Sequence, residues 1–242
     1  MSQPEKKPNI FVYALMVCVV CSLTLTLVAQ GLQSRKELNV ALDKKKNILK
    51  AVGLKNPLSG KAKPEEVLAV FEDKITEIVV DADGNEIVEK TSEDIKEGDE
   101  LYPLYIYREN GEVASYAFPI VGKGLWSTLY GYFAIGPDAI TVKGITFYSH
   151  GETPGLGGEI EKDWFQDNFK GKKIWDMKTE ELKPVEVVKG KAAEAAPKEL
   201  DYHVDGISGA TITSRGVTEM IEREVKKYEP YLSRVRNKHN RS

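Results

Sequence analysis

An uncharged run of twenty residues, from Ile10 to Ala29, constrains this chain more than any other feature of its sequence. As an α-helix, such a run is about 30 Å long, which matches the hydrocarbon core of a bilayer. A cleaved signal peptide is the alternative, but its apolar region is shorter and ends in an A-x-A-like site, whereas this run ends in Leu27-Val28-Ala29. The sequence therefore predicts an uncleaved, single-pass membrane anchor behind a tail of residues 1–9.

Two cysteines, Cys18 and Cys21, lie inside this run. Because they are three positions apart, they share one face of the expected helix. A redox or metal-binding pair is one interpretation of this spacing. Small apolar side chains facing lipid are the plainer one.

The charges on either side of the anchor leave its orientation open. Lys6 and Lys7 precede it, whereas Arg35, Lys36 and the run 44–46 follow it, so a simple count favours a cytoplasmic C-terminal part. Long domains, however, cross a membrane largely regardless of flanking charge. The sequence alone does not decide the side.

Composition excludes several classes of function. A formal net charge of −3 argues against a nucleic-acid partner. Two cysteines and three scattered histidines are poor material for a disulfide framework or a zinc centre. We therefore expect no metal site and no catalytic residue of the chain's own, and we expect any chemistry to depend on a borrowed cofactor.

The segment after the anchor is expected to be a helical stalk. Apolar residues recur there at near-helical spacing until Gly53, and the proline-bounded stretch 57–64 has the composition of a linker. We accordingly assign residues 10–29 to the anchor, 30–63 to the stalk and linker, and 64–242 to one folded domain.

Within that domain, short runs of alternating polarity predict strands, and the dipeptides Asp83-Gly84 and Asn110-Gly111 predict hairpin turns. The expected strands are Ile75 to Val80, Glu86 to Val88, Leu104 to Arg108, Val113 to Phe118, Ile140 to Tyr148 and Val185 to Val188. Short helices are expected after Pro64 and around 164–169, a surface loop at 191–197, and a long amphipathic helix from Arg215 to Leu232 with Ser214 as its N-cap. These elements indicate an α+β domain with an antiparallel sheet and a C-terminal helix.

Three glycine-rich stretches interrupt this pattern, at 122–131, 151–158 and 205–214. None is a Walker A motif or a dinucleotide-binding fingerprint. The third places small residues and then hydroxyls just before a helix, where unpaired N–H groups and the helix dipole favour a phosphate. A hydroxyl-rich capping loop is the alternative interpretation of this stretch.

The sequence Ser208-Gly209-Ala210-Thr211 resembles the S/T-G-A-T flavinylation motif of the FMN-binding domain family, in which a threonine carries FMN through a phosphoester bond. The stretches Gly122 to Trp126 and Glu152 to Gly157 resemble the family's other two signatures. Together with the anchor and stalk, the resemblance covers most of the chain. It extends to the NqrC family, the C subunits of Na⁺-translocating NADH:quinone oxidoreductases, and the RnfG-type subunit of the Rnf complex is the close alternative.

The resemblance implies a set of site residues around a covalent FMN. Attachment falls on Thr211, and the backbone at Gly209 and Ala210 is open to close approach. The neighbouring hydroxyls able to bond phosphate oxygens are Ser208, Thr213 and Ser214. Candidates for the ring pocket are Leu125, Trp126, Thr153, Pro154, Gly155, Leu156 and Gly157, with core packing as the alternative for Trp126. Glu152 either positions a ring edge or caps a turn.

The resemblance also implies a function. The whole complex would oxidise NADH, reduce ubiquinone and export Na⁺, and this chain would relay single electrons between neighbouring subunits. A separate flavin transferase would attach the FMN from FAD. The expected location is the bacterial inner membrane, with the FMN domain on the periplasmic side. A non-enzymatic tethered flavin-binding module is the competing class.

Overall fold

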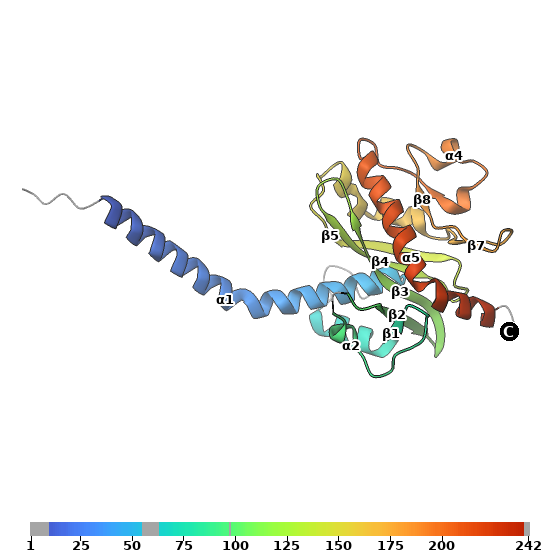
Figure 1. Ribbon diagram of the computed structural model, residues 1–242, viewed down its shortest axis with the longest axis horizontal. Coiled ribbons are helices and arrows are strands. Elements are labelled where there is room, and N and C mark those ends of the chain that lie inside the picture. Colours follow the sequence, from blue (N-terminus) through green and yellow to red (C-terminus); the bar gives the residue numbers. More distant parts are fainter. Residues whose placement is uncertain (1–9, 55–62, 97, 240–242) are drawn as a thin grey trace, which may run out of the picture. The chain divides into compact units, whose positions relative to one another are not determined.

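The computed structural model describes residues 10–54, 63–96 and 98–239 (Figure 1). The expected N-terminal tail and most of the expected linker lie outside the described residues. By its internal contacts the chain divides into two compact units, Met1–Leu42 and Asp43–Ser242. The boundary falls within the first helix, so the last part of the expected stalk packs with the folded domain.

The first helix, α1, runs from Ile10 to Ala51. Its segment Ile10–Gln33 is long and apolar enough to cross a membrane, and its side chains are exposed. Gly53, two residues after the last helical residue, adopts a φ of 97°, and the Leu54 amide donates back to the Leu49 carbonyl at 2.9 Å. This glycine termination explains why the helix stops where the expected stalk stops.

The second unit is built on a five-stranded antiparallel sheet in which sequential strands are neighbours. The tight turn between the second and third strands is formed by Asn110 and Gly111, both with positive φ, as the sequence predicts. The strands are β1 (Ile75–Asp81), β2 (Leu101–Glu109), β3 (Glu112–Lys123), β4 (Thr128–Ile135) and β5 (Val142–Ser149).

One face of the sheet is covered by the long C-terminal helix α5 (Thr211–His239), which packs mainly on β3 (Figure 1). Tyr228 of α5 stacks on Phe118 with ring centroids 4.2 Å apart, and its hydroxyl donates to the Pro103 carbonyl. Such a ring pair adds about 1 kcal/mol to the burial of its apolar area. An apolar core lies between this helix and the sheet.

The other face is covered by the end of α1 and by α2 (Pro64–Lys74). Phe71 packs edge-on against Tyr105, and Tyr105 packs in the same way against Tyr132. A Cβ at Gly144 would lie 2.6 Å from the Ala51 carbonyl, so this glycine allows α1 to approach β5 closely.

The chain between β5 and α5 contains only short elements. They are α3 (Asp163–Gln166), β6 (Trp175–Asp176), β7 (Glu181–Leu182), β8 (Glu186–Val187), α4 (Ala192–Ala195) and β9 (His203–Val204), with single 3₁₀ turns at Gly157–Glu161, Asp167–Phe169 and Leu200–Tyr202. Strands β8 and β9 pair in parallel, and this pair leads into the start of α5.

The α+β fold with an antiparallel sheet and a C-terminal helix is confirmed, but three local predictions were wrong and one strand was not predicted. The 86–88 segment makes one bridge, Val80 to Glu86, and no strand. The turn before it is instead a docking point for α5, because Arg234 binds the carbonyls of Asp83 and Gly84. Residues 128–135 form strand β4, which was not predicted, and the expected loop at 191–197 contains the short helix α4. Helix α5 begins at Thr211, so Ser214 lies in its first turn rather than at its N-cap.

Candidate cofactor site

The Ser208-to-Thr211 segment forms the turn that starts α5. Gly209 adopts a φ of 75°, and the Ala210 amide donates to the Ile207 carbonyl. Thr211 is the first helical residue and its side chain is exposed. Because the first amides of a helix have no partner within the helix, this turn presents N–H groups beside an accessible hydroxyl.

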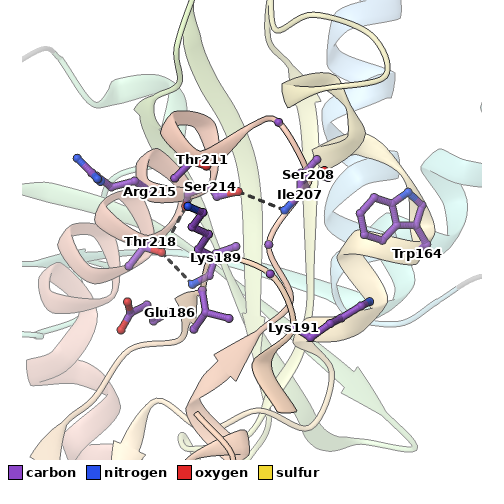
Figure 2. A pocket seen from close by; sticks show the side chains of 15 residues that line it. Trp164, Glu186, Lys189, Lys191, Ile207, Ser208, Thr211, Ser214, Arg215 and Thr218 are labelled. Atoms are coloured by element: carbon purple, nitrogen blue, oxygen red, sulfur yellow. Dashed lines mark hydrogen bonds between the residues drawn. The ribbon is translucent and has the colours of Figure 1, made fainter. Parts of the chain in front are cut away.

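A pocket of about 680 Å³ opens next to this turn. Its walls come from the first turns of α5, the segments 186–191 and 206–209, and α3, which contributes Trp164. Figure 2 shows Thr211, Ser214 and Thr218 on the helix side, with Lys189 beside them, and Trp164 on the other side of the 206–209 segment. The volume lies within the range of small-molecule sites, roughly 300–1,000 Å³.

The floor of this pocket depends on close backbone approach. The Gly206 amide donates to the Gly190 carbonyl at 2.9 Å, and a Cβ at Gly206 would overlap the Val188 carbonyl oxygen. On the helix side, the Thr218 hydroxyl accepts a bond from the Val187 amide. The segments that carry Lys189 and Ile207 are therefore held against each other and against α5.

Three basic residues line the pocket: Lys189, Lys191 and Arg215. Lys191 pairs with Asp205 at 2.7 Å, and Asp205 also accepts a bond from the Ala192 amide. The hydrogen bond from Lys191 is the main reason why the pKa of Asp205 lies below its usual range. Asp205 is thus bound by Lys191 and the Ala192 amide. Lys189 and Arg215 lie near the start of α5 and favour the binding of an anion there.

A second cluster joins the three glycine-rich stretches at one carboxylate. Glu152 is 5% exposed. Its Oε1 accepts bonds from the Trp126 and Ser127 amides, and its Oε2 accepts bonds from the Leu125 amide and the Thr213 hydroxyl, the last at 2.6 Å. We call Leu125–Ser127, Glu152 and Thr213 the carboxylate cluster.

The electrostatics of this cluster favour the ionised form of Glu152. Burial alone would raise the pKa of its carboxyl group. The hydrogen bonds from Thr213 and from the three backbone amides outweigh burial and hold the pKa below its usual range. Glu152 is therefore an anion whose acceptor positions are used within the protein.

The pocket contains only some of the residues expected from the sequence. Ser208, Gly209, Thr211 and Ser214 line it, and Ala210 is buried in the turn that they form. Leu125, Trp126 and the segment Thr153 to Gly157 are not among its lining residues in the described part of the chain. Trp126 is 72% exposed, and Leu156 reaches the site at its edge, where its Cδ2 would lie 2.9 Å from a Cβ at Gly209.

The contacts of Thr213 and Glu152 bear on the roles expected for them. The Thr213 side chain is 1% exposed and donates to Glu152, so it faces away from the pocket. Glu152 was expected either to position a ring edge or to cap a turn. In the structure its carboxylate binds the backbone amides of the 125–127 turn.

Most of the residues that line the pocket were not predicted from the sequence, and among them are Trp164, Lys189, Lys191 and Arg215. Arg215 directly follows the 205–214 stretch and could have been included on that ground. Trp164 and the two lysines lie in segments without a motif, and they reach the pocket only through the packing of α3 and β8.

The chain is similar to proteins of one known family. Residues 124–226 match the family model described as the FMN-binding domain. The chain is 33% identical to the C subunit of the Na(+)-translocating NADH-quinone reductase of Vibrio alginolyticus, over 90% of this chain and 91% of that one. It is also 33% identical to the corresponding protein of Pseudomonas aeruginosa, over 91% and 92%. The crystal structure of the C subunit from Parabacteroides distasonis, 32% identical, has a TM-score of 0.71 and covers 84% of this chain and 97% of that chain.

Proposed function

Since this chain belongs to the family of C subunits of Na⁺-translocating NADH-quinone reductases, we propose that it carries FMN as a phosphoester on Thr211 and relays single electrons inside that complex. An FMN-binding domain and membership of an oxidoreductase complex are the established parts of this statement. The observation that carries the rest is the exposed Thr211 hydroxyl on the first turn of α5, at the edge of a pocket with basic walls.

The residues around Thr211 fit a phosphate. The positive end of a 29-residue helix and its first amides point to the position that a phosphate on Thr211 would take. Lys189 and Arg215 line the same pocket and add two positive charges. Thr213 is already bonded to Glu152, so the hydroxyls left to orient the phosphate are those of Ser208 and Ser214.

The chemistry of attachment favours a separate enzyme. A threonine hydroxyl is a weak nucleophile without a base beside it. Asp205, the carboxylate in the same stretch, is held by Lys191 and the Ala192 amide and is not free to act as that base. We propose that a flavin transferase supplies the base and the FAD: the bond from Thr211 Oγ to phosphorus forms as the bond to AMP breaks.

The chain's own residues would hold and orient the cofactor. FMN supplies one-electron chemistry, and a phosphoester leaves its ring chemically unmodified. Trp164 and the stems of the pocket lysines offer apolar surface beside the attachment point, and the indole Nε1 of Trp164 is fixed by Glu159 at 3.0 Å. The protein would thus set the potential of the cofactor through contacts and charge.

The relay needs partner subunits. The relatives are named as subunits of a reductase that transfers electrons from NADH to a quinone and translocates Na⁺. Among the described residues, one helix is both long and apolar enough to cross a membrane. We propose that electrons enter from and leave to centres in neighbouring subunits, that the complex couples this flow to Na⁺ export, and that the protein lies in the bacterial inner membrane with its FMN domain in the periplasm.

Covalency is the property that tests this proposal. The full chain, co-expressed with a flavin transferase, should give a fluorescent flavin band on a denaturing gel. Thr211→Val is nearly isosteric and should lose that band completely, because no phosphoester can form without the oxygen. Its free energy of unfolding should change by no more than about 1 kcal/mol, since one exposed hydroxyl is lost.

Ser208→Ala is the matched control, because it removes another exposed hydroxyl of the same turn. This variant should keep the band at reduced intensity. A wild-type chain with no band in the presence of the transferase would support a reversible binding module. A band that persists in Thr211→Val would overturn the attachment site.

A further inference from the structure

The carboxylate cluster connects three segments that are far apart in sequence. Glu152 lies 25 to 27 residues from the amides it binds and 61 residues from Thr213. Thr213 follows Thr211 by two positions on the first turn of α5. One buried carboxylate therefore fixes the attachment helix to both of the other glycine-rich loops.

Two glycines have their Cβ space occupied by this carboxylate. A Cβ at Gly124 would lie 2.5 Å from Glu152 Oε1, and a Cβ at Gly157 would lie 2.7 Å from Oε2 and 2.6 Å from the Thr213 hydroxyl. Any side chain at either position would displace Glu152. The absence of a side chain at these two signature glycines is thus explained by the cluster, without contact to a ligand.

The carboxylate has little capacity left for a ligand. Its two oxygens accept four hydrogen bonds, and the side chain is buried. Each of these donors is itself fixed: three are backbone amides and the fourth is a hydroxyl that is 1% exposed. A direct hydrogen bond from the cofactor to this carboxylate would require at least one of these bonds to break, which costs about 1–3 kcal/mol for a buried group.

We propose that Glu152 and Thr213 are positioning residues, which lock loops 124–127 and 152–157 to the start of α5 before any flavin is attached. They act on the cofactor only through the place that they give to Thr211 and to these loops. The effect on the cofactor rests on the proposed function, whereas the contacts that lock the loops to α5 exist in the flavin-free chain.

Hydrogen exchange in the full chain in detergent, expressed without a flavin transferase, tests the lock directly. In Glu152→Gln, one oxygen becomes an NH₂ group that faces donors, so the amides of Leu125, Trp126 and Ser127 should exchange at least tenfold faster. Thr213→Val should accelerate the same amides by a smaller factor. Thr213→Ser keeps the hydroxyl and should restore wild-type protection.

The protein contains an internal reference for this experiment. Asp138 binds the amides of Ile140 and Thr141 in another turn of the same domain, and exchange of those amides should not change in any variant. If Glu152→Gln unfolds, these reference amides will lose protection as well. In that case the two Thr213 variants test the lock: Thr213→Val should lose protection of the 125–127 amides and Thr213→Ser should retain it.

A second measurement separates positioning from contact. Flavin-loaded Glu152→Gln should still carry covalent flavin, because Thr211 is intact, and the visible circular dichroism of the flavin should change together with amide protection. A changed flavin spectrum with unchanged protection of 125–127 would mean direct contact and would overturn the proposal. Unchanged protection in both Glu152→Gln and Thr213→Val would overturn it as well. Loss of attachment in every chain would instead count against the proposed function, and the exchange result would stand.

Discussion

The carboxylate cluster and the pocket beside Thr211 lie at the same end of α5 but differ in construction. The cluster is closed: its carboxylate is buried, its hydrogen bonds are satisfied, and two glycines leave no space beside it. The pocket is open: it has a volume of about 680 Å³, an exposed hydroxyl and cations on its walls.

Residues of one short stretch serve both regions. Thr211 lines the pocket, whereas Thr213 donates into the cluster. A glycine- and hydroxyl-rich signature can therefore encode both a structural framework and a ligand site. Substitutions in the first region should mainly change the stability of the domain, and substitutions in the second should mainly change flavin loading.

The largest effect on stability is expected at Gly216. A Cβ there would overlap the Lys123 carbonyl oxygen, and backbone on both sides prevents relaxation. We expect Gly216→Ala to lower the free energy of unfolding by about 3 kcal/mol, the upper range for overpacking. Urea denaturation of the full chain in detergent, followed by tryptophan fluorescence, measures this change.

Gly155→Ala is the comparison variant in the exposed loop. Gly155 adopts a φ of 75° with no atom near its Cβ position, so the cost is that of a left-handed alanine, about 1 kcal/mol. If the two variants lose the same free energy of unfolding, the contact between α5 and the Lys123 carbonyl is not close enough to exclude a methyl group.

An intermediate effect is expected at Lys189, and on loading rather than on stability. Its ammonium lines the pocket near the first turn of α5 and would face the phosphate (Figure 2). Losing one hydrogen bond to a charged group costs about 1.5–3 kcal/mol. We therefore expect Lys189→Met to slow covalent flavin incorporation by roughly 10- to 100-fold, measured as the fluorescent band at fixed times of incubation with transferase and FAD.

Lys178→Met controls for the loss of a positive charge, because Lys178 lines a separate surface pocket. It should load at the wild-type rate. Equal slowing in both variants would show that net charge, rather than the pocket, guides loading.

The smallest effect distinguishes the two exposed tryptophans. Trp164 lines the pocket and is 47% exposed, whereas Trp126 lies on the 124–127 loop, which is bound by Glu152. At equal occupancy, Trp164→Phe should change the visible absorption of the flavin, and Trp126→Phe should leave it unchanged. Each should change the free energy of unfolding by only about 0.5 kcal/mol. A change in flavin absorption in Trp126→Phe but not in Trp164→Phe would indicate that the flavin ring lies against the 124–127 loop instead.

The sequence predicted those parts of the fold that local patterns determine. The apolar run, the Asn110-Gly111 hairpin and the amphipathic C-terminal helix were all recognisable, because each depends on neighbouring residues. Strand β4 was not predicted, because its first half lies in the glycine-rich stretch 122–131, which was set apart from the strand pattern. In the structure, a Cβ at Gly131 would overlap the Thr146 carbonyl oxygen, so the glycine serves the pairing of β4 with β5.

The candidate site was predictable only in part for a related reason. The position of Thr211 follows from a contiguous stretch and the helix after it. The partner of Glu152 could not be inferred, since a carboxylate beside glycines can face a ligand or a backbone turn, and only the packing of α5 decides which. Trp164 and Lys189 enter the pocket through the fold of the 159–204 segment, which contains no recognisable motif.

The most direct test of the central claim is to locate the FMN on the chain. Trypsin should release the peptide from Glu199 to Arg215, which contains all four Ser and Thr hydroxyls of the 205–214 stretch. In transferase-treated wild type, this peptide should carry the mass of FMN less water, and fragmentation should place it on Thr211. The same peptide from Thr211→Val should carry no adduct. An adduct on Ser208, Thr213 or Ser214, or one that persists in the valine variant, would contradict the assignment of Thr211 as the residue that carries the flavin.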